Sequence, residues 1–323
     1  MHPSIAVVIP AFNSESTINT AIVSALSQSR PPEEVIVVDD GSTDATAEIV
    51  RSYGTVVKLI SQANQGSAVA RQTGTDASSS DFIAYLDADD WWPIDKLSVC
   101  SLILAHEQVD FLLADLQRAH PGSPPESYLP RNSTFFPRMW NFLNNHEVSS
   151  DIPGLYRIPP ALGLSLLLDG FPVFPSTALI RKSVIQTVGG WDARFRRCQD
   201  FDLGLRIARQ FPLHYLDQVQ AILGLHDINY DAHPYVVKQL EGDIRVLEAH
   251  YNAEPIESPY RQQIAKALSR KMYSLGNSHL NAGNTLQARK AYRRAVHWPG
   301  KRMHAIFKLV LSMQPWSKQN SLY

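Results

Sequence analysis

The first 110 residues alternate short runs rich in β-branched residues with longer amphipathic stretches. The short runs cover residues 5–9, 35–38, 56–60 and 82–86. Connections of about 12 residues or more between successive strands are typical of crossovers, which produce a parallel sheet covered by helices on both faces. The pattern therefore predicts an α/β half built on a Rossmann-like, mostly parallel sheet.

Acidic and amide residues follow each of the four predicted strands. They are Asn13, the pair Asp39 and Asp40, Asn64, and the acidic cluster in residues 87–90. Open α/β sheets bind ligands at the carboxyl ends of their strands. Asp and Asn also favour turns through bonds to their own backbone, which would explain one such cluster but not four. We therefore expect a binding site along this edge of the sheet.

The carboxylates suggest a nucleotide and a metal ion as ligands. Asp39 and Asp40 could accept hydrogen bonds from a base or from ribose hydroxyls. Asp87, Asp89 and Asp90 would repel one another unless a hard cation bridged them to diphosphate oxygens. Neither Gly-x-Gly-x-x-Gly nor a Gly-Lys-Ser/Thr loop is present, so a metal is expected to hold the phosphates. Residues 64–71 could add backbone amides and a guanidinium, although a helix cap explains the first three equally well.

Five motifs in order carry a resemblance to a known family. They are residues 8–13, 37–44, 64–66 with 70–71, 87–90, and 189–192 before 199–203. Over about the first 225 residues the chain resembles the family 2 glycosyltransferases. The resemblance implies an α/β, GT-A type domain, to which a C-terminal all-helical extension is added.

The family's site residues carry over to the matching positions. Asp200 would be the catalytic base, Asp40 would recognise the base, and Asp87 the ribose or the metal. The implied metal ligands for Mn²⁺ or Mg²⁺ are Asp87, Asp89 and His226. The implied nucleotide-sugar-binding residues are Pro10, Ala11, Asn13, Asp39, Asp40, Asn64, Gly66, Arg71, Asp87 and Ala88. The chain departs from the family's usual pattern at three positions: Gln72 replaces asparagine, Gln199 replaces glutamate and Gly224 replaces arginine.

The predicted activity is metal-dependent and inverting. A sugar would pass from a nucleotide-sugar, with a UDP-sugar favoured, to an acceptor hydroxyl in cell-surface polysaccharide or glycoconjugate synthesis. The acceptor, whether carbohydrate, lipid-linked or protein, is not identified, because fold-level analogy does not select it. Two alternatives remain, a sugar-phosphate nucleotidyltransferase and a catalytically silent scaffold that uses the helical tail. No nucleic-acid partner is predicted.

Three segments are expected along the chain. Residues 1–110 would bind the nucleotide-sugar, 111–230 would bind the acceptor and carry the base, and 231–323 would form the helical extension. The acceptor side is expected in the Pro- and Ser-rich excursion at 118–160 and around 171–177. Residues 273–299 resemble one tetratricopeptide repeat. A single repeat cannot bury its own face, so a helical hairpin packed on the catalytic domain is the simpler interpretation.

The charge is uneven although the net value is −1. Residues 261–323 contain 12 Lys and Arg and no acid, which predicts either a solvated face or contact with an anionic membrane. The two cysteines, the missing signal-peptide pattern and the absence of a run of about 20 apolar residues predict a cytoplasmic protein. Peripheral contact with the inner face of the membrane is compatible with this prediction.

Overall fold

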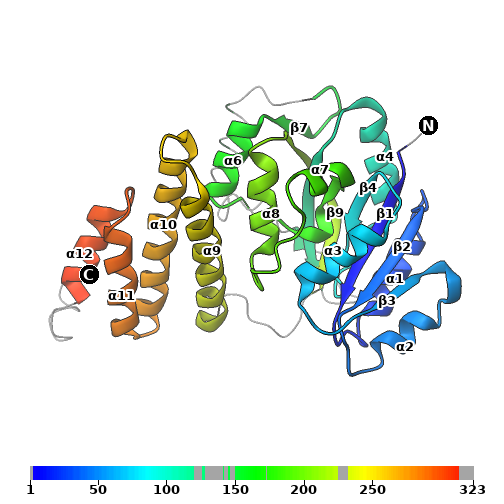
Figure 1. Cartoon of the computed structure of the whole chain (residues 1–323), viewed down its shortest axis with the longest axis horizontal. Coiled ribbons are helices and arrows are strands. Elements are labelled where there is room, and N and C mark those ends of the chain that lie inside the picture. Colours follow the sequence, from blue (N-terminus) through cyan, green and yellow to red (C-terminus); the bar gives the residue numbers. More distant parts are fainter. Residues whose placement is uncertain are drawn as a thin grey trace. The chain divides into compact units, whose positions relative to one another are not determined.

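The computed structural model describes residues 3–119, 126–127, 141, 145, 150–171, 173–224 and 232–312. The chain divides into two compact units, Met1–Asp227 and Ile228–Tyr323 (Figure 1). No helix of the described residues is both long enough and apolar enough to cross a bilayer.

In the described residues the first unit contains one nine-stranded sheet. The strands are β1 (Ile5–Ala11), β2 (Glu34–Asp39), β3 (Lys58–Ser61), β4 (Phe82–Tyr85), β5 (Phe111–Ala119), β6 (Glu126–Ser127), β7 (Leu155–Ile158), β8 (Leu179–Arg181) and β9 (Leu213–Gly224). Their order is β3-β2-β1-β4-β8-β5-β9-β7, with β6 paired to β5. The sheet thus continues across residue 110, because β8 joins β4 to β5.

The four strands at the β3 edge are parallel, as the sequence predicts. β1 pairs with β2 and β4, and β2 pairs with β3, all in parallel. Beyond β4 the sheet is mixed, because β8 runs antiparallel to both neighbours and β7 runs antiparallel to β9. β3 begins two residues later than predicted. Val56 instead ends a 3₁₀ turn, η1 (Gly54–Val56), with an exposed side chain, whereas Val57 is buried.

Helices cover both faces of the parallel part, so its strands are apolar at successive positions. Ile5, Val7 and Ile9 face α1 (Ile18–Leu26), α2 (Thr46–Arg51) and α4 (Lys96–His106). Ile36 and Val38 of β2 face α3 (Ser67–Ala77). Further helical elements with described bounds are α6 (Pro160–Leu168), η2 (Pro175–Thr177), α7 (Lys182–Thr187) and α8 (Gln199–Ala208).

The second unit is helical, as predicted. Its helices are α9 (His233–Ala253), α10 (Pro259–Asn281), α11 (Thr285–Val296) and α12 (Arg302–Ser312), and successive helices pack side by side (Figure 1). At the α10–α11 contact a Cβ on Gly276 would lie 2.4 Å from the Tyr292 ring. The hairpin therefore contains residues of the proposed repeat, Gly276 and Tyr292, in its core.

A buried lysine on α4 binds the backbone of η2, which packs against β4. Lys96 has no exposed surface, and its Nζ donates to the carbonyl oxygens of Ser176 (3.3 Å) and Thr177 (3.2 Å). The same nitrogen lies 4.8 Å from the centroid of the Trp92 ring. Burial lowers the pKa of Lys96 to about 8. Lys96 therefore loses its proton at a lower pH than an exposed lysine does, so its contribution to stability changes with pH in the alkaline range.

The α3–β1 contact yields a first prediction, because a Cβ on Gly74 would lie 2.4 Å from Cγ1 of Val8. Gly74→Ala should lower the free energy of unfolding by about 1–3 kcal/mol, the usual cost of overpacking. Urea denaturation followed by circular dichroism measures it. In an unobstructed helix the same change stabilises by up to about 1 kcal/mol, so a gain would contradict the close packing.

A second prediction concerns Lys96→Met. Between pH 8 and the ordinary lysine pKa of 10.5, the unfolded chain holds more protons at this position than the folded chain. The free energy of unfolding of the parent chain should therefore rise with pH across this window relative to that of the variant. Urea denaturation of both proteins at pH 7 and pH 10 gives the difference. A difference that does not change with pH would show that Lys96 titrates normally.

Candidate functional site

The loops after β1 and β2 are joined by hydrogen bonds. Pro10 and Ala11 at the end of β1 are buried and pair with Val38 and Asp39. Asn13 has a positive φ of 49°, accepts from the Thr43 amide (2.9 Å) and donates its own amide to Ser42 Oγ (2.9 Å). The pairing of β1 with β2 and these hydrogen bonds thus fix the backbone on which the predicted nucleotide-binding residues lie.

Asp40 organises the next loop. Its Oδ1 accepts from Gln62 Nε2 (2.7 Å) and the Gln65 amide (3.0 Å), and its Oδ2 accepts from the Gly66 amide (2.7 Å). Asp40 is 3% exposed. The carboxylate assigned to base recognition therefore also shapes the 62–66 loop, a role that the sequence reasoning missed. Base recognition by Asp40 stays a prediction.

Asp39 and Gly41 shape the neighbouring turn. Asp39 is buried, and its Oδ1 accepts from the Ser42 amide (3.1 Å). Gly41 has φ +79°, and a Cβ there would lie 2.9 Å from the Asn64 amide nitrogen. Asn64 itself is exposed. The loops after β2 and β3 therefore approach each other closely enough that Gly41 cannot be replaced without movement.

The acidic cluster divides into an inward carboxylate and two partly exposed ones. Asp90 is 6% exposed, and it accepts from Ser176 Oγ (2.5 Å) and from the Gly224 amide (3.1 Å). Burial, followed by the charges of Asp89 and Asp87, raises the pKa of Asp90 well above its usual range. A raised pKa favours the neutral form of Asp90, which would reduce the repulsion inside the cluster. Asp90 and Ser176 thus anchor the motif. The sequence pattern predicts that Asp90 shares a cation with Asp87 and Asp89, whereas Ser176 was not among the predicted site residues.

Gly224 explains one departure from the family pattern. A Cβ at this position would lie 2.1 Å from the Asp89 carbonyl oxygen, so the end of β9 approaches the acidic cluster too closely for any side chain. An arginine would displace β9. His226 lies outside the described residues, so its predicted metal contact is not placed.

Arg71 neutralises part of the cluster from α3. Its Nη2 lies 2.6 Å from Asp87 Oδ1, and the guanidinium lies 4.9 Å from the centroid of a Trp191 ring. Burial lowers the pKa of Arg71, but pairing with Asp87 and the nearby charge of Asp200 outweigh it and raise the pKa. Nε and Nη1 of Arg71 are buried without a hydrogen-bond partner. Buried donors of this kind can bind an anionic ligand.

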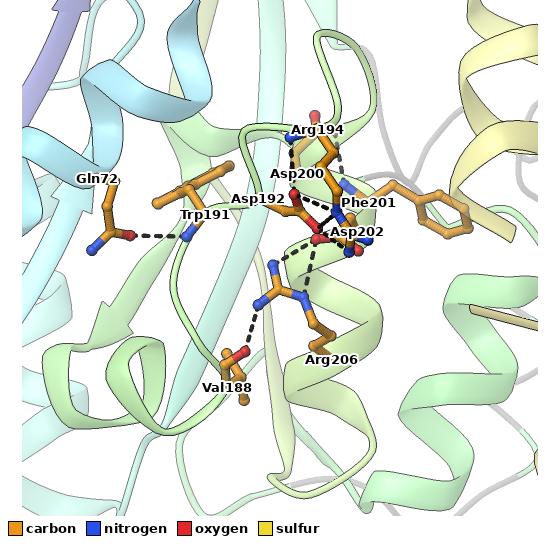
Figure 2. A network of polar contacts seen from close by, with 9 residues as sticks. All are labelled: Gln72, Val188, Trp191, Asp192, Arg194, Asp200, Phe201, Asp202 and Arg206. Carbon is orange, nitrogen blue, oxygen red and sulfur yellow. Dashed lines mark hydrogen bonds and ion pairs between the residues drawn. The ribbon is translucent and has the colours of Figure 1, made fainter. Parts of the chain in front are cut away.

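The loop before α8 is attached to α3 through Gln72 (Figure 2). Gln72 Oε1 accepts from the Trp191 amide (2.9 Å), and a Cβ on Gly190 would lie 2.3 Å from the same oxygen. Trp191 Nε1 donates to Tyr85 Oη (2.9 Å). Glutamine in place of the usual asparagine therefore binds the Gly-Gly-Trp loop directly, which accounts for the second departure.

Asp200 lies in the first turn of α8, where the helix dipole favours a carboxylate. Its Oδ1 accepts from the Phe201 amide (2.8 Å), and the residue is half-buried. Asp202 instead pairs with Arg206 (2.5 Å), and Arg206 donates to the Val188 carbonyl (Figure 2). Asp202 thus stabilises the helix, and Asp200 is the partly accessible acid of this turn.

Gln199 connects α8 to the start of α3. Its Nε2 donates to Ser67 Oγ (2.7 Å), while its Oε1 is buried without a partner. Ser67 is the first residue of α3 and follows Gly66, which has φ +94°. The third departure from the family pattern therefore forms a polar contact between the nucleotide-side helix and the helix of Asp200.

The carboxylates of the acidic cluster are suitable ligands for a hard cation, although the described residues contain no group of three potential metal ligands. Asp87 and Asp89 offer partly exposed carboxylates, with Ala88 buried between them. Carboxylate oxygens are the ligands that Mg²⁺ and Mn²⁺ prefer, and substrate phosphates and water usually complete such sites. The residues present therefore fit such an ion in part, as ligands shared with a phosphate-bearing substrate.

The chain matches known proteins over its first half. The model of the glycosyl transferase family 2 matches residues 6–159. An uncharacterized glycosyltransferase of Haemophilus influenzae is 37% identical over 115 residues, which are 34% of this chain and 43% of that protein. The UDP-Glc:alpha-D-GlcNAc-diphosphoundecaprenol beta-1,3-glucosyltransferase WfgD of Escherichia coli is 30% identical over 115 residues, which are 35% and 46% of the two chains. The matches thus span less than half of either relative.

Two solved structures share the fold. S. aureus TarS 1–349 in complex with UDP-GlcNAc superimposes with a TM-score of 0.64 at 16% identity, over 96% of this chain and 89% of that one. The mannosyltransferase PcManGT from Pyrobaculum calidifontis, in complex with GDP-Man and Mn²⁺, gives a TM-score of 0.58 at 16% identity, over 99% and 85%. The sequence prediction of a GT-A fold is confirmed, and the family resemblance is confirmed by the match of residues 6–159 to the glycosyl transferase family 2 model.

Proposed function

We propose that the chain is a metal-dependent, inverting glycosyltransferase that moves a sugar from a nucleotide-sugar to an acceptor hydroxyl. The observation that carries the proposal is the position of Arg71, which is paired with Asp87 of the acidic cluster and lies within the electrostatic range of Asp200. One buried guanidinium thus connects the carboxylates expected on the donor side with the expected base. A UDP-sugar is the favoured donor.

The nucleotide side is assigned to the loops after β1, β2 and β3. Asp39, Asp40 and Asn13 would bind the base and ribose, and the ordered loop at Gly66 would present its backbone. The free Nε and Nη1 of Arg71 would donate to the diphosphate. Binding energy from these groups positions the anomeric carbon for attack.

Asp87 and Asp89 would hold the Mn²⁺ or Mg²⁺, which when bound would add positive charge beside the leaving diphosphate. The Mn²⁺ complex of PcManGT supports the use of a divalent cation. Asp90 would hold the cluster in place through its hydrogen bonds with Ser176 and Gly224. Arg71 would provide the second positive charge.

Asp200 would take the proton of the acceptor hydroxyl as its oxygen attacks the anomeric carbon on the face opposite the nucleotide. The bond to the diphosphate oxygen breaks in the same step, so the anomeric configuration inverts. A lipid-linked acceptor is favoured, since the name of WfgD specifies a diphosphoundecaprenol acceptor. The basic tail would bring the chain to the membrane surface where such acceptors lie.

Two alternatives are weaker. A sugar-phosphate nucleotidyltransferase would be expected to carry a glycine-rich, basic loop after its first strand, and residues 10–15 contain neither glycine nor a basic residue. A silent scaffold has no need for a partly accessible Asp200, nor for a buried guanidinium on Arg71 whose Nε and Nη1 have no hydrogen-bond partner. Absence of nucleotide-sugar hydrolysis with every donor tested would favour the scaffold.

Asp89→Ala should reduce turnover almost completely and weaken donor binding only when metal is present, because one of few cation ligands is lost. Isothermal titration of UDP-sugars with and without Mn²⁺ separates the two effects. Glu48→Ala, which removes an exposed carboxylate from α2, is the matched control. Full turnover of the Asp89 variant with Mn²⁺ or Mg²⁺ would refute the metal assignment.

Asp200→Asn should lower the rate by about a hundredfold or more and leave donor affinity largely unchanged, since only proton abstraction is lost. Single-turnover rates and donor Kd values test this, with Asp217→Asn as a control at an exposed acid. An equal loss of donor affinity would place Asp200 on the donor instead. A product that retains the anomeric configuration would exclude the single displacement.

A further inference from the structure

The last helix of the second unit has an exposed apolar stripe. Met303, Phe307 and Val310 are 72%, 63% and 54% exposed. Their spacing of four and three residues puts them on one side of α12. Ala305 and Ser312, on the opposite side, are buried. Three large apolar residues of α12 thus point outward, whereas Ile306, Leu309 and Leu311 are partly buried. Such an exposed stripe is unfavourable in water unless a partner covers it.

Exposed cations lie on the same helix as this stripe and on its neighbour α11. Lys290 and Arg293 on α11 and Arg302 at the start of α12 are all exposed. Lys290 and Arg293 lie with Leu286, which is 61% exposed, on the side of α11 opposite its buried residues. Two other basic residues are already used internally, because Arg289 donates to the Ser312 carbonyl and Arg294 pairs with Glu248. The outward cations are thus a defined subset of the basic tail.

We propose that the outward faces of α11 and α12 bind the surface of an anionic lipid bilayer. Met303, Phe307 and Val310 would enter the boundary between headgroups and acyl chains, and Lys290, Arg293 and Arg302 would contact lipid phosphates. An 11-residue helix is about 16 Å long, too short to span a bilayer but suited to lying in its plane. Each basic residue near such a surface strengthens binding about fivefold.

Charge distinguishes this partner from a second copy of the chain. Residues 261–323 contain no acid, so two copies meeting through this surface would place cations against cations. An anionic bilayer supplies both an acyl region for the apolar stripe and negative charge for Lys290, Arg293 and Arg302. The inference extends the proposed function, because the same surface would bring the active site to a lipid-linked acceptor.

The experiment is cosedimentation of the full chain with phosphatidylcholine vesicles that contain 0, 15 or 30% phosphatidylglycerol, at low and high salt. Binding should increase with the anionic fraction and fall with salt. Lys290→Gln/Arg293→Gln should weaken the partition coefficient about 25-fold. The matched control Lys238→Gln/Arg245→Gln removes two exposed cations from α9 and should leave binding unchanged.

The stripe is tested with Met303→Gln/Phe307→Gln/Val310→Gln, three exposed changes to a good helix former. This variant should lose most vesicle binding and keep the donor hydrolysis measured without vesicles. If neither the parent nor the variant hydrolyses the donor, the proposed function is contradicted, but the result on lipid binding still stands. The membrane proposal fails if the chain does not bind anionic vesicles at low salt, if the α9 control weakens binding as much as the α11 variant, or if the apolar variant only abolishes self-association.

Discussion

The site depends on the ion pair between Arg71 and Asp87, which is mostly shielded from water. The side chain of Arg71 is 5% exposed and that of Asp87 is 29% exposed. Removing one partner from such a pair costs more than the pair itself contributes, because the remaining charge is left in a poorly solvated place. The aromatic and polar residues around the pair are arranged on the guanidinium. Trp191 lies against the guanidinium, and Gln72 and Tyr85 hold Trp191.

The acidic cluster is stabilised by different means at its two ends. Asp87 is neutralised by a cation of the chain, whereas Asp90 is buried with a raised pKa and bonded to a hydroxyl and an amide. Asp89 lies between them and is partly exposed. Three adjacent acids therefore have three environments, and the middle one is the most suitable for a ligand from solution.

The sequence predicts those parts of the molecule that depend on local pattern. Runs of buried β-branched residues identified the parallel strands, and the motifs identified the loops at their ends. The mixed half was harder to predict, because β8 has only three residues and β7 lies inside the segment read as irregular. The partners Ser176, Gln62 and Gly224 were also missed. Each is a common residue whose role follows only from contacts across 22 to 134 positions of sequence.

The two bonds of Asp90 also have a consequence for folding. They join the motif to residues 86 and 134 positions away, so forming them requires closure of long loops. Contacts of such high sequence separation form slowly. The acidic cluster should consequently reach its final geometry only when β9 has joined the sheet, late in folding of the first unit. A growing chain that ends near residue 110 would then have the strands of a nucleotide site but no properly anchored cluster.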